Sequence, residues 1–551
     1  MGARRRHIGG LALSMIAIVA IGAGSYAQMR DRDGDGTAAR DRDRDRDRDR
    51  DRDRDRDTVD LSGWRIAGGD LNNSRSQQDE EEIDPSNVGS LAPKWMFSTG
   101  GDVSATPTVA GNAVYFPDWA GNLYAVQAHS GRLLWSHQIA EYNGRPGSVS
   151  RVSPAIYEDE LIIGDNVSSA APHNGAHVMA VDRQTGTLRW ITQVDAHPAA
   201  IITGSPVFHG TTVYVGVSSN EESLAANPAY PCCTFRGSIV ALDATTGALL
   251  WKTFVAPDNA GLTNGYSGNA IWSPPAIDPD RGLLFAATGN NYTVPPDVEQ
   301  CQTEAIRNGT NDADCAAPDD LFDAVLGMNL KTGAIKWARR LSGYDAWNVA
   351  CVVPPARVNC PSPSGPDFDF PGSGPNLVGN ILGIGQKSGI FWALNPANGH
   401  MIWSTVVGPG GLGGGMQWGH ATDGTRFYVQ ITNSSHEPHT LANGGPTITW
   451  GSWAALDVRT GRIIWQRGDP TPGAVDPGAV SVANGVMFAG SSSGAMYALH
   501  ARTGAVLFSF ASGGSVIDAP SIVNGTVYWG SGYRRLAGGT GNNKVYAFSR
   551  R

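Results

Sequence analysis

The chain has 551 residues and a formal net charge of −9, and only 17% of its residues are charged, whereas it contains 70 glycines and 16 tryptophans. This composition is typical of a large all-β globular protein with many turns. An acidic chain of this kind is a poor candidate for nucleic-acid binding, so we expect no nucleic-acid partner.

The N-terminal region has the pattern of an export signal. Residues 1–27 combine three arginines at positions 4–6, an apolar stretch at 11–21 and a small-residue cleavage site at 25–27, which predicts a signal peptide. Because this segment has three arginines and no acidic residue, its removal would change the net charge from −9 to −12. Residues 28–60 are mostly alternating Asp and Arg without an apolar face, which predicts a disordered, solvated spacer. No later stretch is long and apolar enough to span a bilayer, so we expect a periplasmic or secreted protein.

Residues 61–551 repeat one unit. In one copy, an apolar strand at 239–243 is followed by Gly247 and then by Trp251, and glycine suits the tight hairpin between two strands. A second hairpin precedes this pair of strands, for example 106–109 with 114–116. The pattern recurs seven times, with the aromatic residue always four positions after the glycine: Gly131 and Trp135, Gly186 and Trp190, Gly247 and Trp251, Gly333 and Trp337, Gly399 and Trp403, Gly461 and Trp465, Gly504 and Phe508.

Four short antiparallel strands per repeat predict a β-propeller blade. An eighth blade is split, because a strand at 545–548 ends the chain without its partner and a strand at 94–97 begins the repeats without a predecessor. We therefore predict an all-β, eight-bladed propeller of four-stranded antiparallel blades over 61–551, closed by pairing of the N- and C-terminal strands. The recurring aromatic residues are expected to pack between blades rather than to contact a cofactor.

Six cysteines in an exported chain are expected to be oxidised. Cys301 and Cys315 share one predicted insertion and Cys351 and Cys360 share another, so each pair is expected to form a disulfide. Cys232 and Cys233 are adjacent, and a bridge between neighbours closes no loop. We interpret this pair as functional, with two ordinary loop thiols as the alternative.

Strand order assigns the loops to faces. The turns between the first and second and between the third and fourth strands share one face, and they are short. The large insertions at 217–237, 291–324, 342–375 and 408–416 lie on the other face, where we expect the site. The polar and aromatic residues expected there are Arg151, Thr203, Ser218, Glu221, Cys232, Cys233, Trp272, Asn290, Asp345, Trp347, Asn348, Lys387, Gln417 and Trp418.

These residues resemble those of the quinoprotein alcohol dehydrogenases, which are eight-bladed propellers that bind pyrroloquinoline quinone (PQQ) with calcium or a lanthanide. The polyvinyl-alcohol dehydrogenase-like branch is the most similar, through the segments 232–237 and 343–348. The resemblance implies that Trp272 stacks on the quinone, that Glu221 and Asn290 bind calcium, and that Lys387 lies near the quinone oxygens. It places further cofactor contacts at Arg151, Thr203, Ser218, Cys232, Cys233, Gln417 and Trp418.

Two departures from the family pattern affect the expected chemistry. The adjacent cysteines of many relatives come one blade earlier, near Arg145. The family's catalytic Asp follows a Trp, and here that position is Asn348, which cannot accept a proton at neutral pH. Either Asp345 or Glu221 serves as base, or the site is inactive. Ala350 replaces the extra Asp of lanthanide-type relatives, which favours calcium.

The resemblance implies oxidation of an alcohol, either a secondary alcohol or a polyol such as polyvinyl alcohol, with a carboxylate taking the hydroxyl proton and Lys387 stabilising developing negative charge. The chain has no Cys-x-x-Cys-His sequence, so no c-type haem is attached, and an external acceptor such as cytochrome c is expected. The alternative is a non-enzymatic secreted scaffold with the same repeat and no bound quinone, because fold alone does not define function.

Overall fold

The structure is a computed structural model that describes residues 63–551 apart from 168–172, 311–314, 354–356, 373 and 536. The signal peptide predicted at 1–27 and the spacer predicted at 28–60 lie outside the described residues. Within the described residues, no helix is long and apolar enough to cross a membrane.

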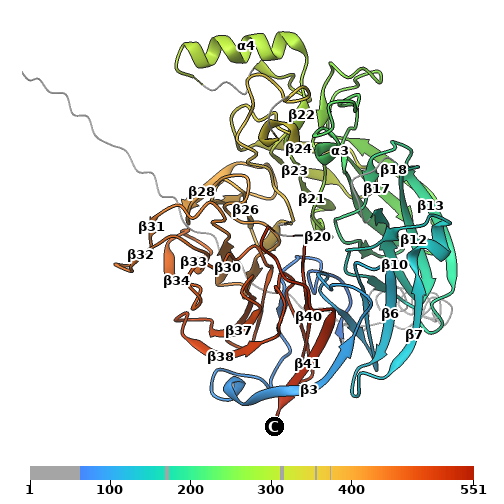
Figure 1. Ribbon diagram of the computed structural model, residues 1–551, viewed down its shortest axis with the longest axis vertical. Helices are drawn as coiled ribbons and strands as arrows, with labels where there is room; N and C mark the ends of the chain where they lie inside the picture. The colour runs from blue at the N-terminus through green and yellow to red at the C-terminus, as the bar shows by residue number, and fades with distance from the viewer. Residues whose placement is uncertain (1–62, 168–172, 311–314, 354–356, 373, 536) are drawn as a thin grey trace, which may run out of the picture. The chain divides into compact units, whose positions relative to one another are not determined.

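Eight sheets are arranged around a central axis, as predicted (Figure 1). Each sheet has four principal antiparallel strands; these follow sequence order from the axis outward in seven sheets, whereas the eighth takes its outermost strand from the N-terminal side of the repeats, and we call the sheets blades 1 to 8. The strands of the first four blades are β4 (Thr108–Ala110), β5 (Ala113–Pro117), β6 (Asn122–Gln127) and β7 (Leu133–Gln138); β9 (Ala155–Tyr157), β10 (Glu160–Gly164), β12 (Ala176–Asp182) and β13 (Leu188–Asp195); β15 (Val207–His209), β16 (Thr212–Ser219), β17 (Ser238–Asp243) and β18 (Leu249–Phe254); β20 (Ala276–Asp278), β21 (Leu283–Ala287), β23 (Ala324–Asn329) and β24 (Ile335–Arg340). The strands of the last four are β25 (Asn376–Val378), β26 (Ile381–Gly385), β27 (Ile390–Leu394) and β28 (Met401–Val406); β29 (Ala421–Thr422), β30 (Arg426–Ile431), β33 (Ser452–Asp457) and β34 (Ile463–Gly468); β35 (Val480–Ala483), β36 (Val486–Gly490), β37 (Ala495–His500) and β38 (Val506–Ala511); β39 (Ser521–Val523), β40 (Thr526–Ser531), β41 (Lys544–Arg550) and β3 (Leu91–Ser98).

Blade 8 closes the ring with strands from both ends of the repeat region. Strand β3 pairs antiparallel with β41 from Leu91 opposite Arg550 to Ser98 opposite Lys544. Figure 1 shows the blue β3 beside the red β41. The pairing confirms the predicted closure and satisfies two strand edges that would otherwise be exposed.

The recurring tryptophans join neighbouring blades. The Trp190 ring lies over Gly247 of the next blade, where an added Cβ would meet the ring at 2.4 Å, and Gly247 has the positive φ (+72°) that the hairpin requires. Trp190 Nε1 donates to the Ala244 carbonyl oxygen at 2.9 Å. An equivalent indole bond to the next blade is made by Trp95, Trp135, Trp337, Trp403 and Trp465. The predicted structural role of these aromatic residues is confirmed.

A segment preceding the first blade contacts the innermost strands of seven blades. We call residues 63–77 the axial thread; its ends form β1 (Gly63–Trp64), which pairs antiparallel with β4, and β2 (Ser76–Gln77), which pairs parallel with β35. Between these ends, thread carbonyl oxygens accept bonds from inner-strand amides at 2.7–2.9 Å, and the side chain of Gln77 donates to blade 8 at 3.1 Å. The amide donors are Ile156, Ile277, Leu377, Thr422 and Val482. The sequence did not lead us to expect this element.

The insertions add short elements. These elements are η1 (Val88–Ser90), α2 (Ile139–Asn143), β8 (Ser148–Val149), β11 (Asn166–Val167), β14 (Ala200–Ile201), α3 (Glu221–Leu224), β19 (Ser267–Gly268), β22 (Asn291–Thr293), α4 (Pro296–Arg307), η3 (Val349–Val352), β31 (His439–Thr440) and β32 (Thr447–Ile448). Disulfides join Cys301 to Cys315 and Cys351 to Cys360, which confirms both predicted pairs. Cys232 and Cys233 also form a disulfide with each other.

Candidate active site

A polar pocket opens on the propeller axis. Its cavity volume is about 70 Å³. Every blade contributes to it through residues just before its innermost strand, and the axial thread contributes Ala67 and Arg75. The lining residues from the blades are Ser104, Ala105, Thr106, Arg151, Ser153, Thr203, Ser205, Trp272, Pro274, Gly372, Trp418, Ala479, Ile517 and Asp518.

Four of the predicted cofactor contacts line this pocket. They are Arg151, Thr203, Trp272 and Trp418. The Arg151 guanidinium carbon lies 6.0 Å from the centre of the Trp418 ring. Thr203 Oγ1 is 2.8 Å from Ser218 Oγ, which brings Ser218 next to the lining. Gln417 is buried, and its amide nitrogen donates to the Gly414 carbonyl oxygen. This nitrogen therefore stabilises its own loop.

Asn290 and Trp272 each keep one buried polar atom free. Asn290 Nδ2 donates to the carbonyl oxygens of Asn291 and Trp347, both at 2.8 Å, whereas its Oδ1 has no hydrogen-bond partner among the described residues. Trp272 Nε1 is also buried without a described partner. An unsatisfied buried atom costs about 1–3 kcal/mol, so these two atoms are suited to receive a ligand.

Glu221 and Glu222 occupy different environments. The Glu221 carboxylate accepts bonds from the backbone amides of Thr234 and Phe235, at 2.9 and 2.8 Å, and from the Tyr230 hydroxyl. It therefore holds the loop that carries Cys232 and Cys233. For Glu222, burial raises the pKa to about 7, the cation of Lys387 opposes the rise, and the charges of Asp369 and Asp345 add to it. The ionisation of Glu222 thus responds to the charges of Lys387, Asp369 and Asp345, and the sequence analysis did not single this residue out.

Lys387 is paired with two carboxylates that the sequence analysis missed. Its Nζ is 3.0 and 2.9 Å from the two oxygens of Asp367 and 2.8 Å from Asp369 Oδ1. Burial opposes the charged form of Lys387, but Asp367 and Asp369 outweigh burial and raise its pKa well above the ordinary value. One feature of the sequence could have pointed to these carboxylates. Asp and Phe alternate at 367–370, shortly before an inner strand on the face with the large loops.

Gly289 places Asp369 beside Trp272. A Cβ at Gly289 would lie 2.9 Å from Trp272 Nε1 and 3.3 Å from Asp369 Oδ2, so both side chains pack against this glycine. Asp369 is therefore positioned between the Lys387 ammonium and the indole that was expected to stack on a ligand. This position makes Asp369 a candidate proton acceptor.

The two residues considered for the base position are engaged by the backbone. Asp345 accepts bonds from the amides of Asp367 (3.0 Å) and Phe368, and burial raises its pKa to about 6 against these bonds. Asn348 caps η3 by accepting from the Ala350 amide and donates to the carbonyl oxygens of Tyr292 and Asn359. All hydrogen-bonding atoms of the Asn348 side chain are thus used in holding loops together.

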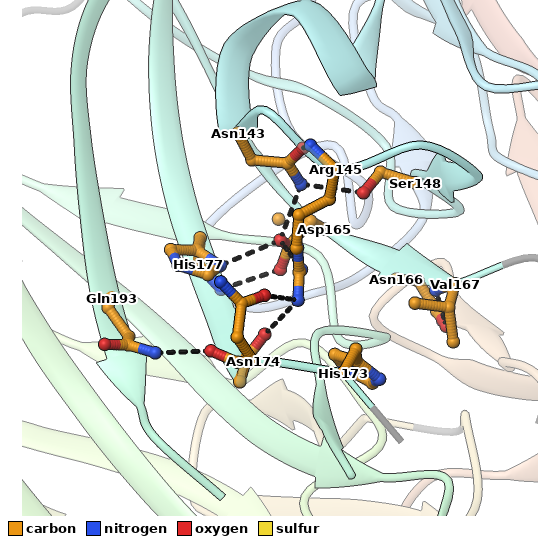
Figure 2. Close-up of polar contacts among 12 residues, drawn as sticks. Asn143, Arg145, Ser148, Asp165, Asn166, Val167, His173, Asn174, His177 and Gln193 are labelled. Atoms are coloured by element: carbon orange, nitrogen blue, oxygen red, sulfur yellow. Dashed lines mark hydrogen bonds and ion pairs between the residues drawn. The ribbon is translucent and has the colours of Figure 1, made fainter. Parts of the chain in front are cut away.

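Near Arg145, where many relatives were expected to carry adjacent cysteines, the chain has a polar network (Figure 2). Asp165 Oδ2 lies 2.6 Å from Arg145 Nη2, 2.9 Å from His177 Nδ1 and 3.0 Å from Asn143 Nδ2. These contacts join α2 and the loop after it to β12 of blade 2. The network supplies a structural link there, while the adjacent disulfide belongs to the Glu221 loop of blade 3; neither Cys232 nor Cys233 is among the lining residues of the axial pocket.

No group of three or more His, Cys, Asp or Glu side chains within the described residues is arranged to hold a metal ion by itself. Among the described residues, the buried oxygens without a hydrogen-bond partner include Asn290 Oδ1 and both carboxylate oxygens of Asp323. Such a partial set fits a calcium ion that completes its coordination with ligand and water oxygens.

The comparisons with known proteins agree with this geometry. Residues 64–404 match the family described as glucose/ethanol/alcohol dehydrogenase, β-propeller domain. The chain belongs to this dehydrogenase family. It is an oxidoreductase of the quinoprotein alcohol dehydrogenase type, which confirms the resemblance seen in the sequence. Residues 451–551 match a second description, that of the outer membrane protein assembly factor BamB.

Two relatives share about a third of their residues with the chain. A polyvinylalcohol dehydrogenase of Pseudomonas sp. is 32% identical over 86% of this chain and 74% of its own. A polyvinylalcohol dehydrogenase of Sphingopyxis sp. (strain 113P3) is also 32% identical, over 89% and 76%. Among solved structures, the quinohemoprotein alcohol dehydrogenase ADHIIG of Pseudomonas putida HK5 superposes with a TM-score of 0.66 at 17% identity, covering 89% of this chain and 80% of that one. That structural likeness bears on the fold.

Proposed function

We propose that the protein is a PQQ- and calcium-dependent dehydrogenase that oxidises a secondary alcohol or a polyol, with polyvinyl alcohol as the first substrate to test. The single observation that carries this proposal is the surroundings of Trp272, which lines the axial pocket: its buried Nε1 has no described partner, and Asp369, which pairs with Lys387, packs with it against Gly289. The names of the two relatives that are 32% identical to the chain support the choice of substrate.

The pocket fits a planar, anionic guest. Two indoles, Trp272 and Trp418, offer flat surfaces, and the hydroxyls of Thr106, Ser153 and Thr203 surround the same space. Asn290 Oδ1, which has no described partner, would be one calcium ligand, whereas the oxygens of Glu221, the other expected ligand, already accept three protein bonds. When bound, PQQ supplies the acceptor for the two electrons and the hydrogen of the alcohol.

The residues of the chain perform the proton chemistry. Asp369 takes the proton of the substrate hydroxyl, because its carboxylate lies beside Trp272 at the pocket. Lys387 remains protonated, since its raised pKa keeps it cationic at neutral pH, and it stabilises negative charge that develops near it. Asp367 holds Lys387 with both carboxylate oxygens. Asp345 is the alternative base.

Electrons then pass to an external acceptor, for which we propose a cytochrome c. The chain has no haem-attachment sequence. The three disulfides fit a periplasmic or extracellular location, where thiols are oxidised.

Reconstitution tests the proposal. The purified protein is mixed with PQQ and calcium, desalted, and assayed for retained quinone and for dye reduction with polyvinyl alcohol and simple secondary alcohols. We expect retention, and we expect Asp369→Asn to retain quinone while losing roughly 100-fold or more in turnover. Asp345→Asn is run in parallel, and Asp159→Asn, at an exposed carboxylate, is the matched control.

The outcomes separate the alternatives. A loss confined to Asp345→Asn would transfer the role of base to Asp345. A wild-type protein that retains no quinone would overturn the enzyme proposal and favour the scaffold function, for which the assembly-factor match of residues 451–551 is the supporting observation. That match covers the last blades and does not include Trp272, Asn290 or Lys387.

A further inference from the structure

The axial thread forms the floor of the axial pocket. The lining residues of the blades precede the inner strands, for example Ser153 before β9 and Pro274 before β20. The thread bonds to residues within those same strands, such as Ile156 and Ile277. The thread therefore lies one layer deeper along the axis than the lining and closes the pocket from beneath.

The thread places one cation at this floor. Arg75 lines the pocket although only 5% of its surface is exposed. The described residues offer its guanidinium one long bond, from Nη1 to the Ala67 carbonyl oxygen at 3.4 Å, and its Nε is buried without a partner. No described carboxylate lies within ion-pairing distance of Arg75. Its charge is thus buried and uncompensated.

The surroundings leave room for this side chain but do not neutralise it. Gly419 packs on the guanidinium, and a Cβ there would lie 2.7 Å from Arg75 Nε. Next to Gly419, burial and the positive charge of Arg75 lower the pKa of His420 to about 3, so that this imidazole is neutral. Burial also lowers the pKa of Arg75, to about 10, which leaves it cationic at neutral pH. An unpaired buried charge is costly, and a bound anion would remove that cost.

We propose that Arg75 is a cofactor-binding residue whose guanidinium pairs with a carboxylate group of the bound quinone at the floor of the pocket. This inference rests on the proposed function, because it takes a planar aromatic polycarboxylate as the ligand. Arg151, which stacks over the Trp119 and Trp418 rings, supplies a second cation at the same pocket. Arginine suits this role because its planar donors match a carboxylate. The axial thread is then part of the binding site as well as of the fold.

The test measures binding rather than turnover. Cofactor-free protein is titrated with PQQ in calcium buffer, and tryptophan fluorescence is followed. We expect Arg75→Gln to bind at least tenfold more weakly than wild type and Arg75→Lys to be intermediate. The matched control is Arg189→Gln, which removes an exposed guanidinium paired with Asp182 on blade 2, and it should bind as wild type does.

A methyl ester of PQQ distinguishes charge pairing from a structural effect. If Arg75 pairs with a carboxylate, wild type prefers the acid over the ester and Arg75→Gln loses most of that preference. An unchanged preference in Arg75→Gln, or PQQ binding within twofold of wild type, would overturn the inference and leave the proposed function intact. Failure of wild type itself to bind PQQ would overturn the proposed function instead.

Thermal unfolding without cofactor gives a second readout. Removing an uncompensated buried charge should leave the melting temperature of Arg75→Gln equal to or above that of wild type. If this variant does not fold, the acid-to-ester preference is measured in Arg75→Lys. A smaller preference than in wild type supports the inference, and the wild-type preference contradicts it.

Discussion

The ammonium of Lys387 lies 2.9 Å from Asp367 Oδ2 inside the propeller, where both side chains are almost wholly removed from solvent. A second carboxylate, that of Asp369, lies 2.8 Å from the same ammonium. The Lys387 ammonium therefore forms ion pairs with two buried carboxylates, and without it both would be buried without this cation.

Lys387→Met should lower the free energy of unfolding by about 3–5 kcal/mol and abolish turnover, because it leaves two carboxylates buried without a cation. Urea unfolding of the cofactor-free protein measures the first effect. The double variant Lys387→Met/Asp367→Asn should recover part of the lost stability. Equal stability of the single and double variants would contradict the pairing.

Reduction of the disulfide between Cys232 and Cys233 should affect binding more than stability. The two cysteines are one position apart and enclose no loop, so little loop-closure entropy is involved. The loop is held by Glu221 and belongs to the face with the large insertions. We expect Cys232→Ser/Cys233→Ser to lower quinone retention without a large change in melting temperature.

The matched control for that variant is Cys301→Ser/Cys315→Ser. This disulfide joins Cys301, within α4, to Cys315, 14 positions later. Its loss should lower the melting temperature and leave quinone retention unchanged. The opposite pattern in the two variants would contradict a functional role for the adjacent pair.

Asp320 should make stability depend on pH. Burial raises the pKa of Asp320 to about 6, although the side chains of Asn291 and Asn269 donate to it. Its contribution is therefore complete below pH 3.8 and is lost as the pH rises through 6. At about 1.4 kcal/mol per pKa unit, the loss is on the order of 3 kcal/mol.

Asp320→Asn keeps an acceptor for both donors and cannot ionise. We expect this variant to be more stable than wild type at pH 7.5 and the difference to be smaller at pH 4.5. Urea midpoints at the two pH values measure the difference. A gain of equal size at both would show that ionisation is not the cause.

The axial thread should be needed for a stable ring. Trp64 is 1% exposed and belongs to β1, which pairs with the inner strand of blade 1. Trp64→Ala should cost about 3–5 kcal/mol, measured by urea unfolding, because it leaves a large cavity. Leu262→Ala is the control at an exposed apolar residue and should cost little.

The propeller was predictable because its signals are local. A glycine that permits the hairpin and an aromatic residue four positions later, as in Gly247 and Trp251, recur at each blade regardless of what lies elsewhere in the chain. The same local character applies to the pairs Cys301–Cys315 and Cys351–Cys360. Even ring closure followed from counting strands, since one was missing at each end.

The site was predictable only in part. Arg151, Thr203, Trp272 and Trp418 line the pocket because their positions just before inner strands all point to the axis. Sequence position could not predict that Glu221 and Glu222 have different surroundings, because neighbouring residues in a short helix point in different directions. Asp367 and Asp369 were missed because their role depends on pairing with Lys387, which is about twenty residues away in the sequence.

By itself, the sequence determined eight blades, their closure and the disulfides of the insertions, because each depends on short-range pattern and strand order. Only the tertiary structure decided which carboxylates surround Lys387 and that residues 63–77 form the pocket floor. The thread has no such pattern: its bonds are made by backbone atoms and by contacts such as Gln77 with Ile522, 445 positions apart. Every residue except proline offers the same backbone donor and acceptor. The sequence therefore does not indicate which backbone groups of the thread and the inner strands pair; the folded ring determines it.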